Sequence, residues 1–257
     1  MITSTRNNRI KEIRQLQAQA KARRKENAFV VEGVRLCEEA VAAGWKTRLC
    51  LYSPYLNERG QALVQELIEQ GVPAEAAAEH VIKAASDTQS PQGIILVLRM
   101  DPLPMPENPD FILILDHVQD PGNQGTLLRT AAAAGADAVL ISEGSADVFA
   151  PKVIRAGMGA HFRLPMATWT SDEIISFCRR QRLEMWAAVL DEGAPYTQAR
   201  LDEPSALIIG SEAHGVGAAL SKAARPLHIP MPGGGESLNA AAAGAILLYE
   251  AVRQRSG

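Results

Sequence analysis

A loop near the C-terminus reads Ile229-Pro-Met-Pro-Gly-Gly-Gly-Glu-Ser-Leu-Asn239 and runs directly into an alanine-rich segment, Ala240 to Arg255. The prolines and glycines predict an open turn, and the alanines predict a helix that begins near Ser237 or Asn239, since both are good N-cap residues. Glycines let a ligand approach the main chain, and N–H groups at a helix start can donate to it. Taken alone, this pattern fits a cofactor loop or an ordinary strand-to-helix connection.

Two further segments share the pattern of an apolar run followed by a polar loop that contains glycine. Phe111 to Leu115 leads into Asp-His-Val-Gln-Asp-Pro-Gly-Asn123, and Ala206 to Ile209 leads into Gly-Ser-Glu-Ala-His-Gly-Val-Gly217. Continuous apolar runs of this length predict buried parallel strands. Open α/β sheets bind ligands at the carboxyl ends of such strands, so the three loops are expected to form one site.

Together these segments resemble the motifs of the SpoU (TrmH-like) branch of the SPOUT methyltransferases. Members of this family transfer a methyl group from S-adenosylmethionine to a ribose 2′-hydroxyl of RNA. The resemblance lies in these motifs: Asn123 and Arg129 spaced six apart, Gly210-Ser-Glu212, Ile229-Pro-Met231 and Ser237-Leu-Asn239. It implies an S-adenosylmethionine-dependent RNA methyltransferase, a trefoil knot in the C-terminal domain and a homodimer.

Proline content predicts two domains. The segment Asp101-Pro-Leu-Pro-Met-Pro-Glu-Asn-Pro109 cannot support regular structure and is expected to be a linker, 101–109. Residues 1–100 predict a small α/β domain, in which Asn27-Ala-Phe-Val-Val-Glu-Gly33 and Ser90-Pro-Gln-Gly93 resemble the substrate-binding domain that often precedes the catalytic one. Residues 110–257 alternate helical patterns with apolar runs and predict a mostly parallel sheet. The strands are expected at 111–115, 138–142, 184–190, 206–210 and 227–231.

The N-terminal segment is strongly basic, although the chain has a net charge of −3. Residues 1–35 hold nine lysines and arginines against three acidic residues. Phosphate contacts supply most of the sequence-independent affinity for RNA, so this segment predicts an RNA-binding surface, with a solvated helix as the alternative. The separate first domain favours ribosomal RNA over tRNA, by analogy. The residues expected to contact RNA are Arg9, Lys11, Arg23, Arg24 and Lys25.

The resemblance also implies roles for single residues. Those expected to contact S-adenosylmethionine are Gly210, Ile229, Met231 and Leu238. Those expected in the catalytic site are Asn123, Arg129, Glu212, Ser237 and Asn239. The family role of Arg129 is to help deprotonate the ribose hydroxyl, but arginine stays protonated in proteins, so gripping the adjacent phosphate is the alternative. Asn123 is also placed where an N-cap would be, and Glu212 can order the loops instead of acting on RNA.

One stretch departs from the family pattern. Ala150 and Gly157 stand where the family commonly has Asn and Ser, so two hydrogen-bonding side chains are missing around Pro151 and Lys152. This departure puts local substrate or dimer contacts in doubt. The cofactor motifs are intact.

Several classes of protein are disfavoured by the sequence. It has no apolar run of the ~18 residues that span a bilayer and no signal-peptide core, so no membrane contact is expected and the cytoplasm is the predicted location. Three scattered cysteines predict neither disulfides nor zinc, and no metal site is indicated. No G-x-x-x-x-G-K-[ST] motif supports nucleotide hydrolysis at Gly233 to Gly235. The remaining alternatives are a non-catalytic RNA-binding or ribosome-assembly factor and a tRNA- or base-methylating SPOUT enzyme.

Overall fold

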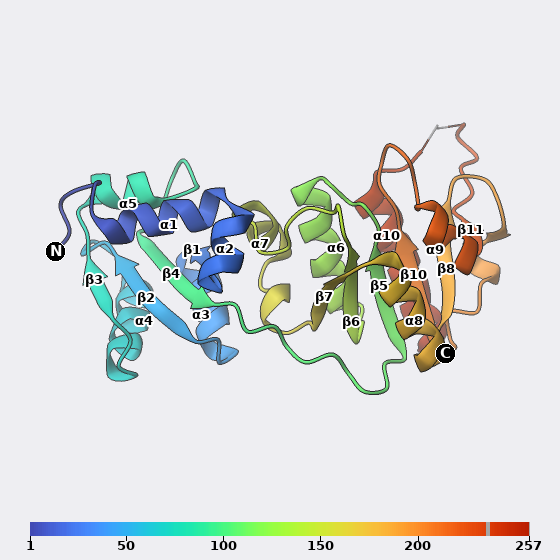
Figure 1. The fold of residues 1–257 in the computed structure, drawn as a ribbon, viewed down its shortest axis with the longest axis horizontal. Helices are drawn as coiled ribbons and strands as arrows, with labels where there is room; N and C mark the ends of the chain where they lie inside the picture. The colour runs from blue at the N-terminus through green and yellow to red at the C-terminus, as the bar shows by residue number, and fades with distance from the viewer. Residues whose placement is uncertain (235–236, 257) are drawn as a thin grey trace. The chain divides into compact units, whose positions relative to one another are not determined.

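A computed structural model describes residues 1–234 and 237–256 and divides the chain into two compact units (Figure 1). Unit 1 comprises Met1–Asp101 together with Phe149–Arg155. Unit 2 comprises Pro102–Val148 and Ala156–Gly257. The segment Phe149–Arg155 therefore belongs with the N-terminal residues. The chain leaves unit 2 after Val148 and returns to it at Ala156.

Unit 1 is a four-stranded mixed sheet covered by helices. The strand order is β1 (Ala28–Glu32), β4 (Ile94–Arg99), β2 (Thr47–Tyr52) and β3 (Ala74–Ala76). β4 is antiparallel to both β1 and β2, and β3 is parallel to β2. One face packs on α1 (Asn8–Ala18) and α5 (Glu79–Ala85), and the other on α3 (Val34–Ala42) and α4 (Glu58–Glu69) (Figure 1).

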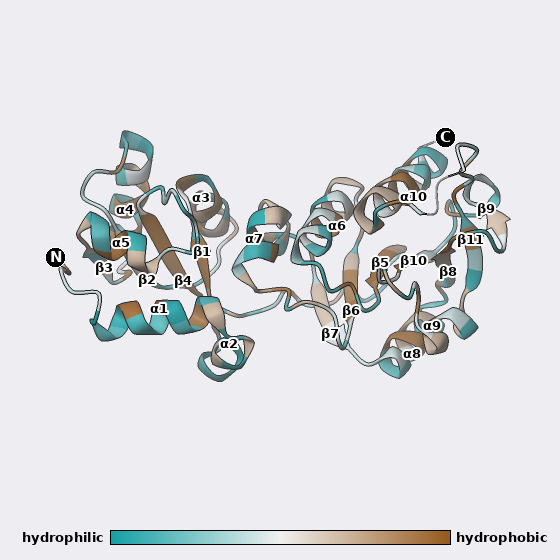
Figure 2. Ribbon diagram, turned by 90° about the horizontal axis from the view of Figure 1, so that it is seen from above, coloured by the Kyte–Doolittle hydropathy of each residue, from teal (hydrophilic) through white to brown (hydrophobic). Residues whose placement is uncertain are grey.

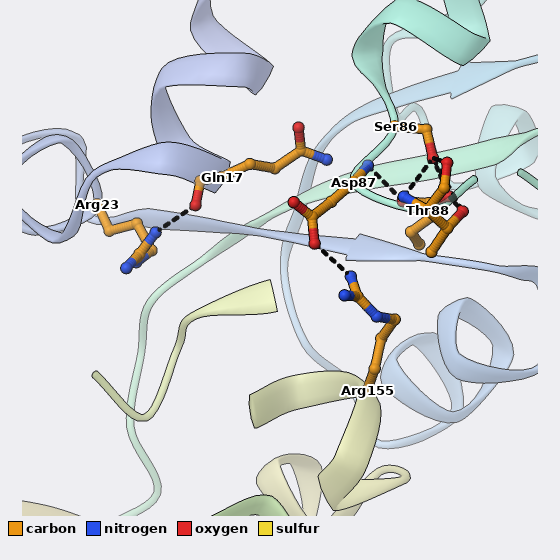
Figure 3. Close-up of polar contacts among 7 residues, drawn as sticks. Gln17, Arg23, Ser86, Asp87, Thr88 and Arg155 are labelled. Atoms are coloured by element: carbon orange, nitrogen blue, oxygen red, sulfur yellow. Dashed lines mark hydrogen bonds and ion pairs between the residues drawn. The ribbon is translucent and has the colours of Figure 1, made fainter. Parts of the chain in front are cut away.

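The basic N-terminal segment forms two helices, because the chain breaks at Gln19. Gln19 is extended, with φ −130°, and separates α1 from α2 (Ala20–Glu26). The break leaves carbonyl groups at the end of α1 without helical partners. Arg23 supplies hydrogen-bond donors to these carbonyls. Its guanidinium is buried and donates to the Leu16 carbonyl at 2.5 Å. It also donates to the Gln17 carbonyl at 3.0 Å (Figure 3).

Unit 2 contains a seven-stranded sheet whose pairings are all parallel among the described residues. The strand order is β7 (Met166–Trp169), β6 (Ala138–Ser142), β5 (Phe111–Leu115), β10 (Ser205–Ile209), β8 (Glu184–Val189), β11 (Arg225–His228) and β9 (Ala194–Pro195). The predicted α/β fold with a mostly parallel sheet is confirmed, and the trefoil knot stays a prediction. The last predicted strand is shorter than expected, since it ends at His228 before Pro230, which has no N–H to donate.

Helices cover both faces of this sheet. α6 (Pro121–Ala133) and α10 (Ala240–Arg255) lie on one face, and α8 (Ser171–Gln181) and α9 (Ala218–Ala223) on the other (Figure 2). Burial on both faces explains why β5 is apolar throughout, and why β6 and β10 are apolar except for their terminal residues Ser142 and Ser205.

The order of the strands determines where a site can form. From β5 the chain first builds β6 and β7 on one side, and β10 later inserts between β5 and β8. β5 and β10 are therefore neighbours at the point where the order reverses, with Leu115 paired to Ile209 at their carboxyl ends. Ligands bind in open α/β sheets at this kind of switch point.

Three further predictions from the sequence concern membrane contact, the cysteines and the location of the protein. No described helix has the length and apolar character that a membrane span requires. The three cysteines, Cys37, Cys50 and Cys178, are buried thiols, and burial raises the pKa of Cys50 and of Cys178 to about 12. These thiols are therefore poor nucleophiles. The cytoplasmic location stays a prediction.

Candidate active site

The loops that follow β5 and β10 are joined through Asp116. The Asp116 N–H donates to the Ile209 carbonyl at 2.8 Å, and its carboxylate Oδ2 accepts from the Gly217 N–H at 2.6 Å. Asp116 is fully buried, and its Oδ1 has no hydrogen-bond partner among the described residues; the His117 ring nitrogen Nε2 lies 3.7 Å away. Asp116 thus holds the 210–217 loop against the end of β5. No role was predicted for Asp116 from the sequence, although its position directly after a buried strand could have indicated one.

Three of the predicted catalytic residues form one hydrogen-bonded chain. The Asn123 amide Nδ2 donates to the Glu212 carboxylate, and its Oδ1 accepts from Asn239 Nδ2 at 3.0 Å. These partners are 89 and 116 residues away from Asn123 in sequence. The structure therefore brings together one side chain from each of the three predicted loops.

The helix starts differ in part from the sequence prediction. Asn123 is not the N-cap of α6: Asp120 is, and its Oδ1 accepts from the Asn123 N–H at 2.8 Å, with Pro121 in the first turn. Because capping falls to Asp120, the Asn123 side chain is free to bond Glu212 and Asn239. Asn239 does cap α10, accepting from the N–H groups of Ala241, at 2.9 Å, and Ala242, at 3.2 Å.

Gly210 begins a very tight loop. Ser211 and Gly215 exchange two main-chain hydrogen bonds of 3.0 and 2.9 Å, which fold Glu212 out to the solvent-exposed tip. A Cβ placed on Gly210 would lie 2.1 Å from the Gly215 carbonyl carbon and 2.3 Å from Val216 N. Backbone atoms cannot yield as a flexible side chain can, so only glycine fits here.

The third predicted loop carries apolar side chains. Ile229 and Met231 are half-buried, whereas Leu238 is 40% exposed and Ser237 is exposed. Gly235 and Glu236 lie outside the described residues. An apolar wall with main-chain groups at hand suits the adenine ring and the aliphatic carbons of S-adenosylmethionine, and the large exposed Leu238 side chain is a surface that such a ligand would cover.

Arg129 does not join the hydrogen-bonded chain. It lies on α6 six residues after Asn123, which places it about 9 Å further along the helix and about a third of a turn around it. It is exposed and has no hydrogen bond or ion pair to the described part of the protein. An uncommitted guanidinium on an exposed helix face is available to an external anion.

The departure at Gly157 has a structural reason. A Cβ at Gly157 would lie 2.7 Å from Cε1 of His161. His161 is buried, its Nε2 is 2.8 Å from the Val148 carbonyl oxygen, and burial lowers the pKa of the imidazole to about 4. The imidazole thus fills the space that a serine side chain at 157 would need. Ala150 has no polar side chain, and its carbonyl accepts from the Ile154 N–H at the start of α7 (Pro151–Gly157).

The basic residues of unit 1 divide into two groups. Lys11, Arg24 and Lys25 are exposed, and Arg9 is paired with Glu75 at 2.7 Å. Arg23, which was predicted to contact RNA, is only 4% exposed and donates to main-chain carbonyls within its own unit. That prediction is corrected: Arg23 joins α1 to α2 and is not part of an RNA-binding surface. In the described ranges, no group of three His, Cys, Asp or Glu side chains has a metal-binding arrangement.

Comparison with known proteins identifies the family of both units. The SpoU rRNA Methylase family matches residues 110–249, and the MRM3-like substrate binding domain matches residues 7–96. The chain is 35% identical over 249 residues to the 23S rRNA guanosine 2′-O-methyltransferase RlmP of Bacillus subtilis, covering 96% of this chain and 97% of that protein. It is 32% identical to a 23S rRNA uridine 2′-O-methyltransferase of Streptomyces viridochromogenes, covering 98% and 92%.

Solved structures of methyltransferases are similar to this chain over nearly its whole length. An rRNA methyltransferase of Sinorhizobium meliloti superimposes with a TM-score of 0.88 at 30% identity, covering 98% of this chain and 96% of that one. The SpoU methyltransferase AviRb of Streptomyces viridochromogenes, in complex with S-adenosylmethionine (AdoMet), gives 0.89 at 28% identity, covering 98% and 100%. These matches confirm the predicted enzyme class, an RNA methyltransferase that uses S-adenosylmethionine. The chain belongs to the SpoU rRNA methylase family.

Proposed function

We propose that this enzyme methylates a ribose 2′-hydroxyl of ribosomal RNA, at a site built around Asn123, Glu212 and Asn239. The hydrogen-bonded chain through these three residues is the observation that carries the proposal, because it joins all three motif loops at the sheet's switch point. Relatives along nearly the full length of the chain are named as 23S rRNA 2′-O-methyltransferases, which supports ribosomal RNA over tRNA.

The cofactor contacts are assigned to Gly210, Ile229, Met231 and Leu238. Gly210 follows the end of β10 and begins the tight 211–215 turn, and the three apolar residues supply a wall for the adenine ring. When bound, S-adenosylmethionine supplies a methyl group already activated on a sulfonium. The protein therefore has to orient the ribose hydroxyl, exclude water and accommodate the hydroxyl proton.

The polar residues have separate tasks in this proposal. Asn123 is held on both sides, by Glu212 and by Asn239, so its amide has a fixed orientation beside the attacking hydroxyl. Glu212, on the exposed tip of its loop, can also accept a hydrogen bond from a ribose hydroxyl. Ser237 precedes the start of α10 and adds a hydroxyl at the same place in the chain.

Arg129 is assigned to the phosphate beside the target ribose. Its guanidinium is exposed and uncommitted among the described residues, and it stays protonated at neutral pH, so it is a better anion ligand than a base. A planar fork binds a phosphate with two hydrogen bonds, which a lysine cannot do. We therefore expect Arg129→Lys to lose most methyl transfer while its thermal stability stays near that of the wild type, and full turnover of that variant would refute this role.

A homodimer is part of the proposal and is supported by the outer face of α10. Ile246 and Tyr249 lie three residues apart, on the same side of the helix, and are 37% and 52% exposed. Large neighbouring apolar side chains on a surface are typical of a protein interface. Light scattering should give the dimer mass for the wild type and the monomer mass for Tyr249→Glu. The matched control is Leu190→Glu, which changes another exposed apolar residue and should remain dimeric.

The activity itself is tested with methyl-labelled S-adenosylmethionine and unmodified ribosomal RNA or tRNA. A 2′-O-methyl group removes the hydroxyl that alkaline cleavage requires, so label recovered in dinucleotides from ribosomal RNA is the expected result. Label in mononucleotides would show base methylation instead. Label only in tRNA would refute the assigned substrate, and RNA binding without any incorporation would favour a non-catalytic binding protein.

A further inference from the structure

Unit 1 contains a cavity of about 260 Å³ that the site in unit 2 does not use. It lies where β2 ends and β4 begins, beside one flank of α5. Ser53 and Ile82, which are 5% and 2% exposed, are its most buried lining residues. Drug-sized ligands occupy roughly 300–1,000 Å³, so this cavity suits a smaller group.

One wall of the cavity is fixed before any ligand arrives. Pro91 and Gln92 form this wall, at the end of the 86–92 loop. The Glu32 carboxylate accepts hydrogen bonds from the Ser86 hydroxyl, from the Asp87 N–H at 3.1 Å and from the Thr88 hydroxyl at 2.5 Å. These bonds tie the start of the loop to the end of β1.

Two further contacts hold the same loop. Asp87 pairs with Arg155 of the Phe149–Arg155 segment at 2.8 Å (Figure 3). Gln92 Oε1 accepts from the Val34 N–H at 2.9 Å and so satisfies the start of α3. This orientation leaves the Gln92 amide N–H groups available as donors at the cavity wall. A wall fixed in this way costs little ordering entropy when a ligand binds.

The rim of the cavity has the chemistry of a nucleotide site. Tyr55 is 79% exposed, so its ring offers a face for stacking. Lys83 is exposed and has no ion pair within the described ranges, while Glu79, one turn earlier on α5, adds an acceptor. α5 packs in one core with the basic helix α1, on which Lys11 is exposed, so another cationic side chain lies on the neighbouring helix.

We propose that this cavity binds one unpaired nucleotide of the RNA substrate. The base stacks on Tyr55 and bonds to polar groups of the wall, and Lys83 binds a neighbouring phosphate. Base–aromatic stacking requires a base that is free of its helix, so the site selects a loop or bulge rather than a continuous duplex. The inference rests on the proposed action on RNA, and it adds a specificity-determining subsite to it.

The experiment measures binding of the full-length Tyr55→Ala variant to an unmodified large-subunit ribosomal RNA transcript by filter retention. Loss of one base–aromatic stack is expected to weaken binding by about 5- to 150-fold. Tyr55→Phe should retain near wild-type affinity, because its ring still stacks. Lys83→Ala should lower the slope of log K against log salt by about 1, as the loss of one phosphate contact does.

Matched controls separate the cavity from the surface around it. Ile68→Ala removes another exposed apolar side chain, from α4, and Lys46→Ala removes another exposed lysine; both should bind as the wild type does. S-adenosylmethionine binding, measured by calorimetry, should be unchanged in every variant. Failure of the proposed function itself would appear differently, as a wild-type protein that neither binds nor methylates the transcript.

Three outcomes would overturn the proposal. The first is wild-type affinity in Tyr55→Ala. The second is an equal loss of affinity for a perfectly paired RNA duplex, which would mean that the ring contacts the backbone and not an unpaired base. The third is a loss in Tyr55→Phe as large as in Tyr55→Ala, since that would assign the effect to the hydroxyl instead of the aromatic ring.

Discussion

Replacing Asn239 separates the two tasks of its side chain, because Oδ1 caps α10 and Nδ2 donates to Asn123. Asn239→Ala loses both, and a lost N-cap costs about 0.5–2 kcal/mol. In a protein of this size, about 1 kcal/mol corresponds to a fall in Tm of about 2–4 °C. Asn239→Asp keeps an acceptor for the N–H groups of Ala241 and Ala242, and a carboxylate is favoured at a helix N-terminus, so its Tm should stay near the wild-type value.

Activity should not follow stability in these two variants. Both lack the donor to Asn123, and one hydrogen bond contributes about 0.5–1.5 kcal/mol, or roughly 2- to 13-fold in rate. Asn239→Asp also places a carboxylate against Asn123 Oδ1, and these two oxygens repel each other. The same Asn123 amide is held by Glu212, so the fall in the methyl-transfer rate should reach the upper end of that range. Thermal unfolding and methyl transfer to ribosomal RNA, measured on the same preparations, give the two quantities.

Two results would refute this reasoning. Full methyl transfer by Asn239→Asp would show that the bond between Asn239 and Asn123 has no part in orienting the substrate. A fall in Tm as large in Asn239→Asp as in Asn239→Ala would show that the Oδ1 contacts do not cap α10.

Gly210→Ala should abolish S-adenosylmethionine binding in calorimetry, because the new Cβ would lie 2.1 Å from the Gly215 carbonyl carbon; retained affinity would contradict the assigned loop. Burial lowers the pKa of His161 from 6.5 to about 4, so the unfolded state takes up a proton first as the pH falls. Stability is therefore fully present above about pH 6.5 and should decrease by roughly 3 kcal/mol as the pH falls to 4, and urea unfolding of His161→Gln should lack this part of the pH dependence. Arg23→Met should lower the free energy of unfolding by about 1–3 kcal/mol, since the Leu16 carbonyl loses its donor, yet leave the salt dependence of RNA binding unchanged. Arg24→Ala should do the reverse, with a salt slope lowered by about 1.

The sequence predicted the features that depend on nearby residues. The apolar runs predicted at 111–115, 138–142 and 206–210 correspond to the buried strands Phe111–Leu115, Ala138–Ser142 and Ser205–Ile209, because a strand covered on both faces is mostly apolar. The short edge strand β7 was not predicted. It is partly exposed, so its four residues do not form a long apolar run in the sequence. Nothing in the residue type of Gln19 marks the break between α1 and α2.

The residue types at the strand ends can be read from the chain alone: an amide in one loop, a carboxylate in the second, and a second amide before a helix. Tertiary structure decided which of their atoms meet. Asn123 bonds Glu212 and Asn239 only because β10 inserts beside β5 and α10 packs on α6. It also buried Arg23 and left Arg129 exposed, although both are arginines on helices. Residue type fixes what a group can donate or accept, whereas its partner and its burial depend on contacts between residues far apart in the chain.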